Sequence, residues 1–133
     1  MPTMHQDRTI TAPMVYPDSA PFWEAAKESR LLIKRCRDCS QFHWYPRTIC
    51  PHCGSDATEW VQASGRATIY SVSVTRRAGP QAYAIAYVTL DEGVTMMTNI
   101  IDCDLDTLRI GDRVTVAFRE SDGGPPVPMF RPV

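Results

Sequence analysis

The chain has 133 residues, of which 44% are hydrophobic and 22% are charged, and its net charge at pH 7 is −1. This length allows one ordinary domain, or a small metal-binding module joined to a compact domain, and the composition is that of a soluble globular protein. The nearly neutral charge does not favour nucleic-acid binding, and no apolar run approaches the roughly twenty residues that a membrane span needs. The first residues lack the pattern of a signal peptide, so we expect a cytoplasmic protein with no membrane contact.

The first part of the chain is predicted to contain one short helix. Residues 1–17 include three prolines and show no regular period, which predicts an extended or disordered arm. A helix is expected at residues 18–29, because Asp18 or Ser19 can cap its start and Pro21 suits its first turn. Phe22 and Trp23 belong to its apolar stripe. We assign Phe22 to the core and consider Trp23 a candidate contact for a partner.

Residues 30–60 contain two pairs of cysteines, each with two residues inside the pair and with ten residues between the pairs. Two such pairs in a short segment are typical of a tetrahedral Zn²⁺ site, in which each thiolate lies about 2.3 Å from the metal. The predicted ligands are Cys36, Cys39, Cys50 and Cys53. Because sulfur fills all four positions, we expect a structural site with no place for a substrate.

Short strands near residues 31–33 and 42–47 would complete a rubredoxin-like zinc ribbon. A module of this size buries too little apolar surface to fold alone, so the metal is expected to supply the missing folding energy. Iron accepts the same four thiolates. The sequence therefore leaves Zn²⁺, which is usual in structural sites, and iron as alternatives.

From Gly65 onward the hydrophobic pattern has a period of two, which predicts β-strands. Strands are expected at residues 67–74, 83–90, 94–101, 113–119 and 127–131, with a loop or short helix at 105–110. The first of them is predicted to end before Gly79-Pro80. Several short strands in one half of a chain favour a small closed barrel, because closure removes exposed sheet edges. The Leu-x-x-Gly-Asp-Arg-Val phrase at residues 108–114 is typical of OB-type barrels.

These features together resemble the thiolase-associated zinc-ribbon/OB-fold family, known as domain of unknown function 35. The resemblance runs from about residue 18 to the end of the chain. It rests on Phe22-Trp23, residues 31–39, Pro46-Arg47, residues 50–53, Trp60, Gly65, residues 67–74, residues 111–114 and residues 128–130. Ser40 replaces the glycine that is usual after the first cysteine pair. The expected architecture is mainly β, with an arm at 1–17, a helix at 18–29, a zinc ribbon at 30–60 and an OB-fold domain at 61–133.

The resemblance implies a non-catalytic accessory subunit. Members of the family accompany thiolase-like or ketoacyl-synthase-like enzymes, and sometimes hydratases of the hot-dog fold. They are needed for acyl-transfer, condensation or retro-aldol activity on acyl-CoA compounds, including the degradation of steroid side chains. We therefore expect a hetero-oligomer with a thiolase-like enzyme, and acyl-CoA as a further ligand.

The residues themselves agree with a helper role. The sequence contains no recognisable Ser-His-Asp or Cys-His pattern of a nucleophilic enzyme. Arg76 and Arg77 are candidates for contact with a CoA phosphate, since they lie in a stretch with nine basic and four acidic residues, 27–77. The candidates for partner contact are Trp23, Trp44, Tyr45 and Arg47.

Two other functions fit parts of the pattern. Zinc ribbons and OB barrels both bind single-stranded nucleic acids, but the predicted outer faces of the strands lack aromatic residues interleaved with Arg or Lys. Four thiolates on iron would instead make an electron carrier of the rubredoxin type. Salt-dependent oligonucleotide binding would identify the first function, and a coloured, redox-active protein the second.

Overall fold

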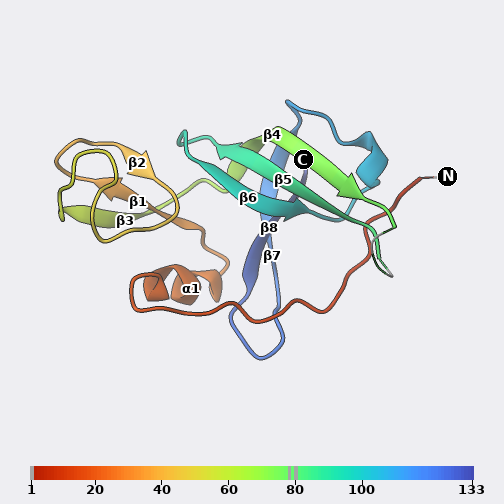
Figure 1. Ribbon diagram of the computed structural model, residues 1–133, viewed down its shortest axis with the longest axis horizontal. Helices are drawn as coiled ribbons and strands as arrows, with labels where there is room; N and C mark the ends of the chain where they lie inside the picture. The colour runs from red at the N-terminus through yellow and green to blue at the C-terminus, as the bar shows by residue number, and fades with distance from the viewer. Residues whose placement is uncertain (1, 78, 80) are drawn as a thin grey trace.

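The computed structural model describes residues 2–77, 79 and 81–133, and it contains two β units and one short helix. Figure 1 shows a small three-stranded sheet at one end, a five-stranded barrel at the other, and the helix lying below the space between them. The expected mainly β architecture is confirmed. Within the described residues, no helix has the length and apolar character needed to cross a membrane.

Helix α1 spans Ala20–Ala26, which is shorter than the predicted range. Ser19 is its N-cap residue, but the Ser19 side chain makes no capping hydrogen bond and instead donates to the Tyr16 carbonyl at 3.3 Å. Pro21 lies in the first turn, where a backbone N–H would have no acceptor within the helix, so the lack of one in proline costs nothing. Phe22 and two alanines face the interior, so packing holds this short helix in place.

The small sheet has strand order β2-β1-β3 and both pairings are antiparallel. Its strands are β1 (Leu32–Cys36), β2 (Phe42–His43) and β3 (Thr58–Gln62). The second strand is shorter than expected, because the chain leaves the sheet at Trp44 and Pro46 has no N–H to extend a ladder. The third strand was not predicted. It pairs with the whole of β1 and ties the segment after the second cysteine pair back onto the ribbon.

The second unit is a closed barrel with strand order β4-β5-β6-β8-β7. Its elements are β4 (Arg66–Thr75), β5 (Tyr83–Leu90), β6 (Thr95–Ile100), the 3₁₀ turn η1 (Leu105–Thr107), β7 (Arg113–Arg119) and β8 (Val127–Pro132). Among the strand pairs of the barrel in the part of the chain that the structure describes, only β6–β8 is parallel. This is the order and direction of strands in an OB-fold. The predicted break between strands falls at Gly79-Pro80, and Pro80 lies outside the described residues.

A β-bulge in β4 changes which side chains face the barrel interior. The pairing with β5 shifts between Ile69 and Ser71, so Tyr70 turns outward with 67% of its surface exposed. Before the bulge the interior positions are Ala67 and Ile69, and beyond it Val72 and Val74 pack against the core. The regular alternation predicted for this strand therefore holds only up to the bulge.

One hydrophobic core joins the helix, the ribbon and the barrel. Phe22 of α1, Ile33 of β1 and Val88 of β5 belong to the same cluster of buried residues. The chain passes from ribbon to barrel at Gly65, whose φ of +81° suits glycine. A Cβ at this position would lie 2.7 Å from Cγ1 of Val116. The junction is therefore packed too closely for a larger residue.

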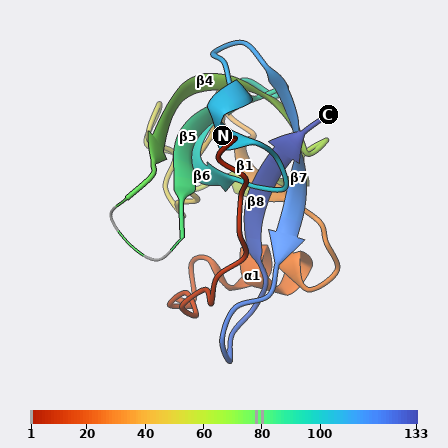
Figure 2. The same ribbon diagram turned by 90° about the vertical axis from the view of Figure 1, so that its right-hand side faces the viewer.

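The N-terminal arm lies on the barrel in an extended conformation. Figure 2 shows it passing in front of β6 and β8 on its way to α1. Met4 forms an antiparallel bridge with Asp104, and Thr11 forms a parallel bridge with Asp122. The arm thus touches the loops that follow β6 and β7, two segments that are far from it in sequence.

Candidate metal centre and docking surface

The fold brings the four predicted ligands together. Their sulfur atoms all lie within 4.8 Å of one another, with Cys36 and Cys53 at 3.6 Å and Cys39 and Cys50 at 3.7 Å. Four thiolates at about 2.3 Å from one tetrahedral metal are separated by roughly 3.8 Å. The cluster therefore has the chemistry and the size of a Cys₄ site, with two buried members and two that are nearer the surface.

Each cysteine pair ends in a tight turn that aims its thiols inward. The N–H of Ser40 donates to the Cys36 carbonyl at 2.8 Å, and the N–H of Gly54 donates to the Cys50 carbonyl at 2.9 Å. Both residues have positive φ, +65° at Ser40 and +78° at Gly54. The first turn therefore keeps the geometry of a glycine turn although serine occupies the position.

The thiols differ in how readily they lose a proton. The backbone N–H of Cys39 is the largest influence on Cys36 and lowers the pKa of its thiol to about 7. At Cys53 a backbone hydrogen bond from Ser55 lowers the pKa, but the neighbouring Cys36 sulfur and burial outweigh it and raise the pKa to about 12. Adjacent thiolates repel one another, so four of them at this spacing require a cation.

The ribbon also holds a buried lysine and a buried histidine. Lys34 is only 8% exposed, and its ammonium group lies 4.6 Å from the centre of the Trp60 ring. Burial lowers the pKa of Lys34. His43, directly opposite Lys34 on β2, is 3% exposed, and its Nε2 accepts a hydrogen bond from the N–H of Arg47 at 3.2 Å. Both side chains therefore support the ribbon from within.

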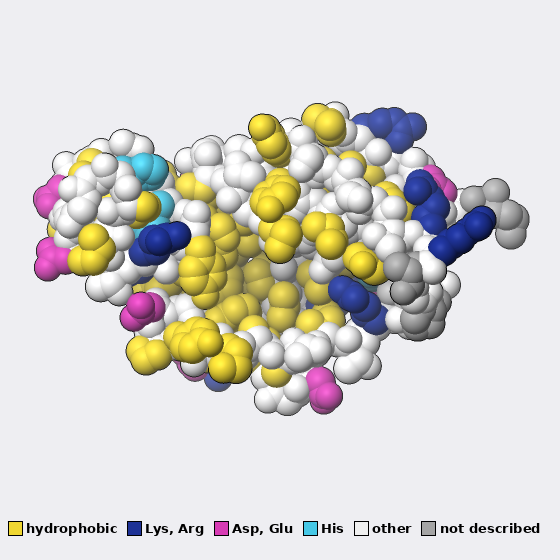
Figure 3. All heavy atoms as spheres, in the orientation of Figure 1, with side chains coloured by type: hydrophobic (Ala, Val, Ile, Leu, Met, Phe, Trp, Pro, Cys, Tyr) yellow, Lys and Arg dark blue, Asp and Glu magenta, His cyan; other side chains and the backbone are white. Residues whose placement is uncertain are grey.

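Four aromatic rings connect α1 with the ribbon. The Phe22 ring lies 4.8 Å from Trp23 and 5.0 Å from Trp44, and Trp44 lies 5.4 Å from Tyr45. Burial increases toward Phe22, which is 2% exposed, whereas Tyr45 is 50% exposed and the nearby Ile49 is 51% exposed. Figure 3 shows hydrophobic side chains gathered in the hollow between ribbon, helix and barrel. Three of the predicted partner contacts, Trp23, Trp44 and Tyr45, therefore belong to one aromatic group that runs from the core to the surface.

The basic candidates lie in different surroundings. Arg47 is exposed and follows the aromatic group on the ribbon. Arg76 forms an ion pair with Asp106, its Nε lying 3.0 Å from a carboxylate oxygen. Arg77 is exposed at the end of β4. The structure thus separates Arg76 and Arg77 from the ribbon, and it gives Arg76 an internal partner.

A second cluster of potential ligands, which was not predicted, is formed by His5, Asp7 and Asp102. Nδ1 of His5 accepts a hydrogen bond from the N–H of Asp102 at 3.2 Å, and Arg119 pairs with both carboxylates. The guanidinium group already supplies the positive charge that a metal would bring. This cluster therefore fastens the arm to the barrel, and only the contact between distant segments reveals it.

Comparison with known proteins assigns the family. Residues 23–59 match the model described as the ChsH2 rubredoxin-like zinc ribbon domain, and residues 60–119 match the ChsH2 C-terminal OB-fold domain. The chain belongs to the ChsH2/DUF35 family. The resemblance found in the sequence is thus confirmed. The two matches meet between residues 59 and 60, inside β3, so this strand contains the end of one domain model and the start of the next.

Two curated relatives illustrate the family. A "DUF35 domain-containing scaffold protein" of Methanothermobacter thermautotrophicus is 34% identical over 92 residues, which are 65% of this chain and 69% of that protein. A "Probable enoyl-CoA hydratase alpha subunit" of Thermomonospora curvata is 36% identical over 124 residues. That alignment covers 90% of this chain but 39% of the relative, so the chain spans well under half of that protein's length.

Two solved structures share the fold. One is described as "Ltp2-ChsH2(DUF35) aldolase" and is 36% identical, with a TM-score of 0.79 over 90% of this chain and 98% of that chain. The other is a DUF35 protein of unknown function from Sulfolobus solfataricus, with 14% identity and a TM-score of 0.66 over 88% of this chain and 86% of that chain. The second likeness concerns the fold alone.

Proposed function

We propose that this chain is a non-catalytic accessory subunit that binds a thiolase-like enzyme and supports its action on acyl-CoA substrates. The observation that carries the proposal is the likeness, at 36% identity, to nearly the whole of a chain in the Ltp2-ChsH2(DUF35) aldolase. The scaffold role in the name of the Methanothermobacter relative points the same way. We further propose that the two proteins form a hetero-oligomer in the cytoplasm and that this complex acts in lipid or steroid metabolism.

We propose Zn²⁺ as the metal of the ribbon. The sulfur distances of 3.6 and 3.7 Å fit one tetrahedral ion. All four donors are thiolates, so the ion holds the two cysteine turns against the sheet and takes no part in bond making. Cys36 ends β1, and Cys50 and Cys53 precede β3. Metal binding therefore fixes the two ends of the segment between Cys39 and Cys50, which carries Trp44 and Tyr45.

The docking surface is proposed to be the outer edge of the aromatic group. Tyr45 supports this, because it is 50% exposed and its ring lies 5.4 Å from that of Trp44. Ile49, which is 51% exposed, follows on the same segment of the ribbon. A rigid apolar edge loses little conformational entropy when a partner covers it. Trp23, Trp44 and Arg47 complete the surface, the first two as supporting rings and Arg47 as a flanking charge.

Of the two basic candidates, Arg77 is proposed as the main contact with the CoA phosphates. This side chain is exposed, whereas Arg76 would have to leave Asp106 in order to bind a phosphate. An arginine guanidinium can donate two parallel hydrogen bonds to a phosphate. Replacing Arg77 with Gln should therefore raise the KM for acyl-CoA in the complex more than replacing Arg76.

Coexpression with a thiolase-like enzyme tests the function directly. The two chains should co-purify, and the enzyme should turn over acyl-CoA substrate only when this chain is present. Tyr45→Ala and Ile49→Ala should weaken co-purification, while Ile110→Ala should not, because Ile110 is 72% exposed but lies on the barrel, outside the ribbon. An enzyme that is fully active alone and never binds this chain would refute the proposal, as would turnover by the isolated chain.

A further inference from the structure

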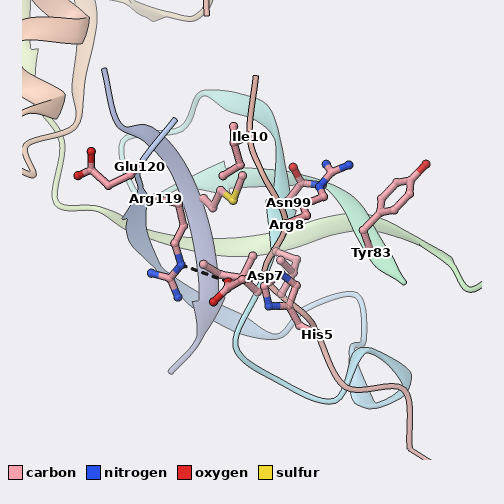
Figure 4. A pocket seen from close by; sticks show the side chains of 11 residues that line it. His5, Asp7, Arg8, Ile10, Tyr83, Asn99, Arg119 and Glu120 are labelled. Carbon is pink, nitrogen blue, oxygen red and sulfur yellow. Dashed lines mark ion pairs between the residues drawn. The ribbon is translucent and has the colours of Figure 1, made fainter. Parts of the chain in front are cut away.

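The N-terminal arm and the barrel enclose a cavity of about 270 Å³ (Figure 4). The arm is fastened on both sides of it. The N–H of His5 donates to the Cys103 carbonyl at 2.8 Å, and the N–H of Asp122 donates to the Ile10 carbonyl at 2.8 Å. Residues 6–9 span the space between these two attachments, so the arm forms one wall of the cavity.

The barrel provides an apolar floor at the seam where its strands share the fewest paired residues. Strands β6 and β8 share one pair of partners, Ile100 and Phe130, whereas the pairs β5–β6 and β7–β8 each align six. Ile100 and Met129 line the cavity on the side of this seam, and Ile10 lines it from the arm. A cavity of this kind, bordered by hydrocarbon, suits an apolar molecule.

Most charged groups at the rim are already paired or directed elsewhere. Arg119 lies 3.8 Å from Asp7 and also pairs with Asp102, so these three charges largely satisfy one another. Figure 4 shows the carboxylate of Glu120 pointing away from the other lining side chains. The remaining charge at the cavity belongs to Arg8.

Arg8 is held at the rim by an aromatic ring. Its guanidinium lies 4.9 Å from the centre of the Tyr83 ring, and no carboxylate among the described residues forms an ion pair with it. Arg8, Tyr83 and Asn99 also line an adjacent cavity of about 340 Å³ that continues toward Met97. A stacked guanidinium keeps its N–H groups free in its own plane, where a carboxylate can bind in a bidentate manner.

We propose that the cavity beneath the arm binds a small monocarboxylate with a hydrocarbon body of about six carbons. An engineered cavity of roughly 150 Å³ holds benzene, so about 270 Å³ accommodates a body of that size together with its carboxylate. The carboxylate binds Arg8, and the hydrocarbon contacts Ile10, Ile100 and Met129. This site is independent of the proposed docking of a partner enzyme.

A titration of the full-length protein with hexanoate tests the assignment. The readout is the NMR signals of isotope-labelled methyl groups, with hexan-1-ol and n-hexylamine as matched ligands. Hexanoate should shift the signals of Ile10, Ile100 and Met129 to saturation. It should bind at least about fivefold more tightly than the alcohol, because its carboxylate pairs with Arg8. A much larger preference is not expected, since Arg8 is exposed and its charge is partly screened. The amine should bind more weakly than both.

Variants then locate the carboxylate. Arg8→Gln should reduce hexanoate binding to the level of the alcohol, Arg8→Lys should retain part of the preference, and Arg66→Gln should change nothing. Unchanged signals of Ile33 and Val88 would show that each variant is folded. Equal binding of acid and alcohol, a preference that survives Arg8→Gln, or no shift of the cavity methyl groups with any ligand would each overturn the proposal.

Discussion

Replacing Gly65 with alanine should destabilise the protein by about 2–3 kcal/mol. Two effects contribute. At a φ of +81° an L-residue costs about 1–2 kcal/mol, of which about 0.4–1 kcal/mol is offset because alanine restricts the unfolded chain. The new Cβ would also lie 2.7 Å from Cγ1 of Val116, and overpacking of this kind costs about 1–3 kcal/mol.

A control separates these two effects. Gly93 has a φ of +100°, but a Cβ there would meet no atom within 4 Å. Gly93→Ala should therefore cost only about 1 kcal/mol or less. The double variant Gly65→Ala/Val116→Ala should be more stable than the sum of the two single effects predicts, because shortening Val116 makes room for the new methyl group.

Urea unfolding of the metal-loaded protein measures all four variants, with tryptophan fluorescence and circular dichroism as parallel probes. The three tryptophans lie at positions 23, 44 and 60, in the helix and the ribbon, while most of the β signal comes from the barrel. Equal losses for Gly65→Ala and Gly93→Ala, together with strict additivity of the double variant, would refute the close contact at the junction.

Two further predictions concern pH. Metal affinity should fall as the pH is lowered between about pH 8 and 6, since the thiols of Cys36 and Cys53, with pKa values of about 7 and about 12, must lose their protons to bind; chelator competition would measure this, and a pH-independent affinity would contradict it. The Thr3 hydroxyl and then Arg76 hold the pKa of Asp106 below its ordinary value of 3.8. The stability that Asp106 gives the arm is therefore present above that value and lost as the pH falls through the lower folded-state pKa; amide exchange of Thr3 should be faster in Asp106→Asn at neutral pH, and the difference should vanish in strong acid.

The metal centre could be predicted from sequence because its signal is local. The spacing of Cys36 and Cys39, and of Cys50 and Cys53, follows from the geometry of a turn that presents two sulfur atoms to one ion. Strand β3 lacked such a signal. It is recognisable through its partner β1, and pairing between segments more than twenty residues apart leaves no pattern in either segment alone.

The barrel shows where a regular period misleads. Strand β4 was predicted from alternating residues, but one bulge after Ile69 exchanges the inner and outer faces for the rest of the strand. Val72 and Val74 then lie inward, although they share parity with the exposed Tyr70. A bulge depends on the twist and closure of the whole barrel, which the sequence of one strand does not contain.

The arm was the least predictable part. Its polar residues and prolines indicate an extended segment, and nothing within residues 1–17 identifies the loops that receive it. Asp102 and Asp106, which hold His5 and Thr3, follow β6 in the chain. The cavity and the Arg119 cluster form only where these distant segments meet, so they could not be predicted from a single sequence motif.

The core shared by Phe22, Ile33 and Val88 gives the ribbon an influence beyond its own three strands. If the ion leaves and the cysteine turns relax, strand β1 and its Ile33 lose their fixed position in that shared core. A shortage of metal, or oxidation of the thiols, would then destabilise the barrel and the helix together with the ribbon. If the chain is the accessory subunit proposed above, the activity of the complex would depend on metal supply and on a reducing environment.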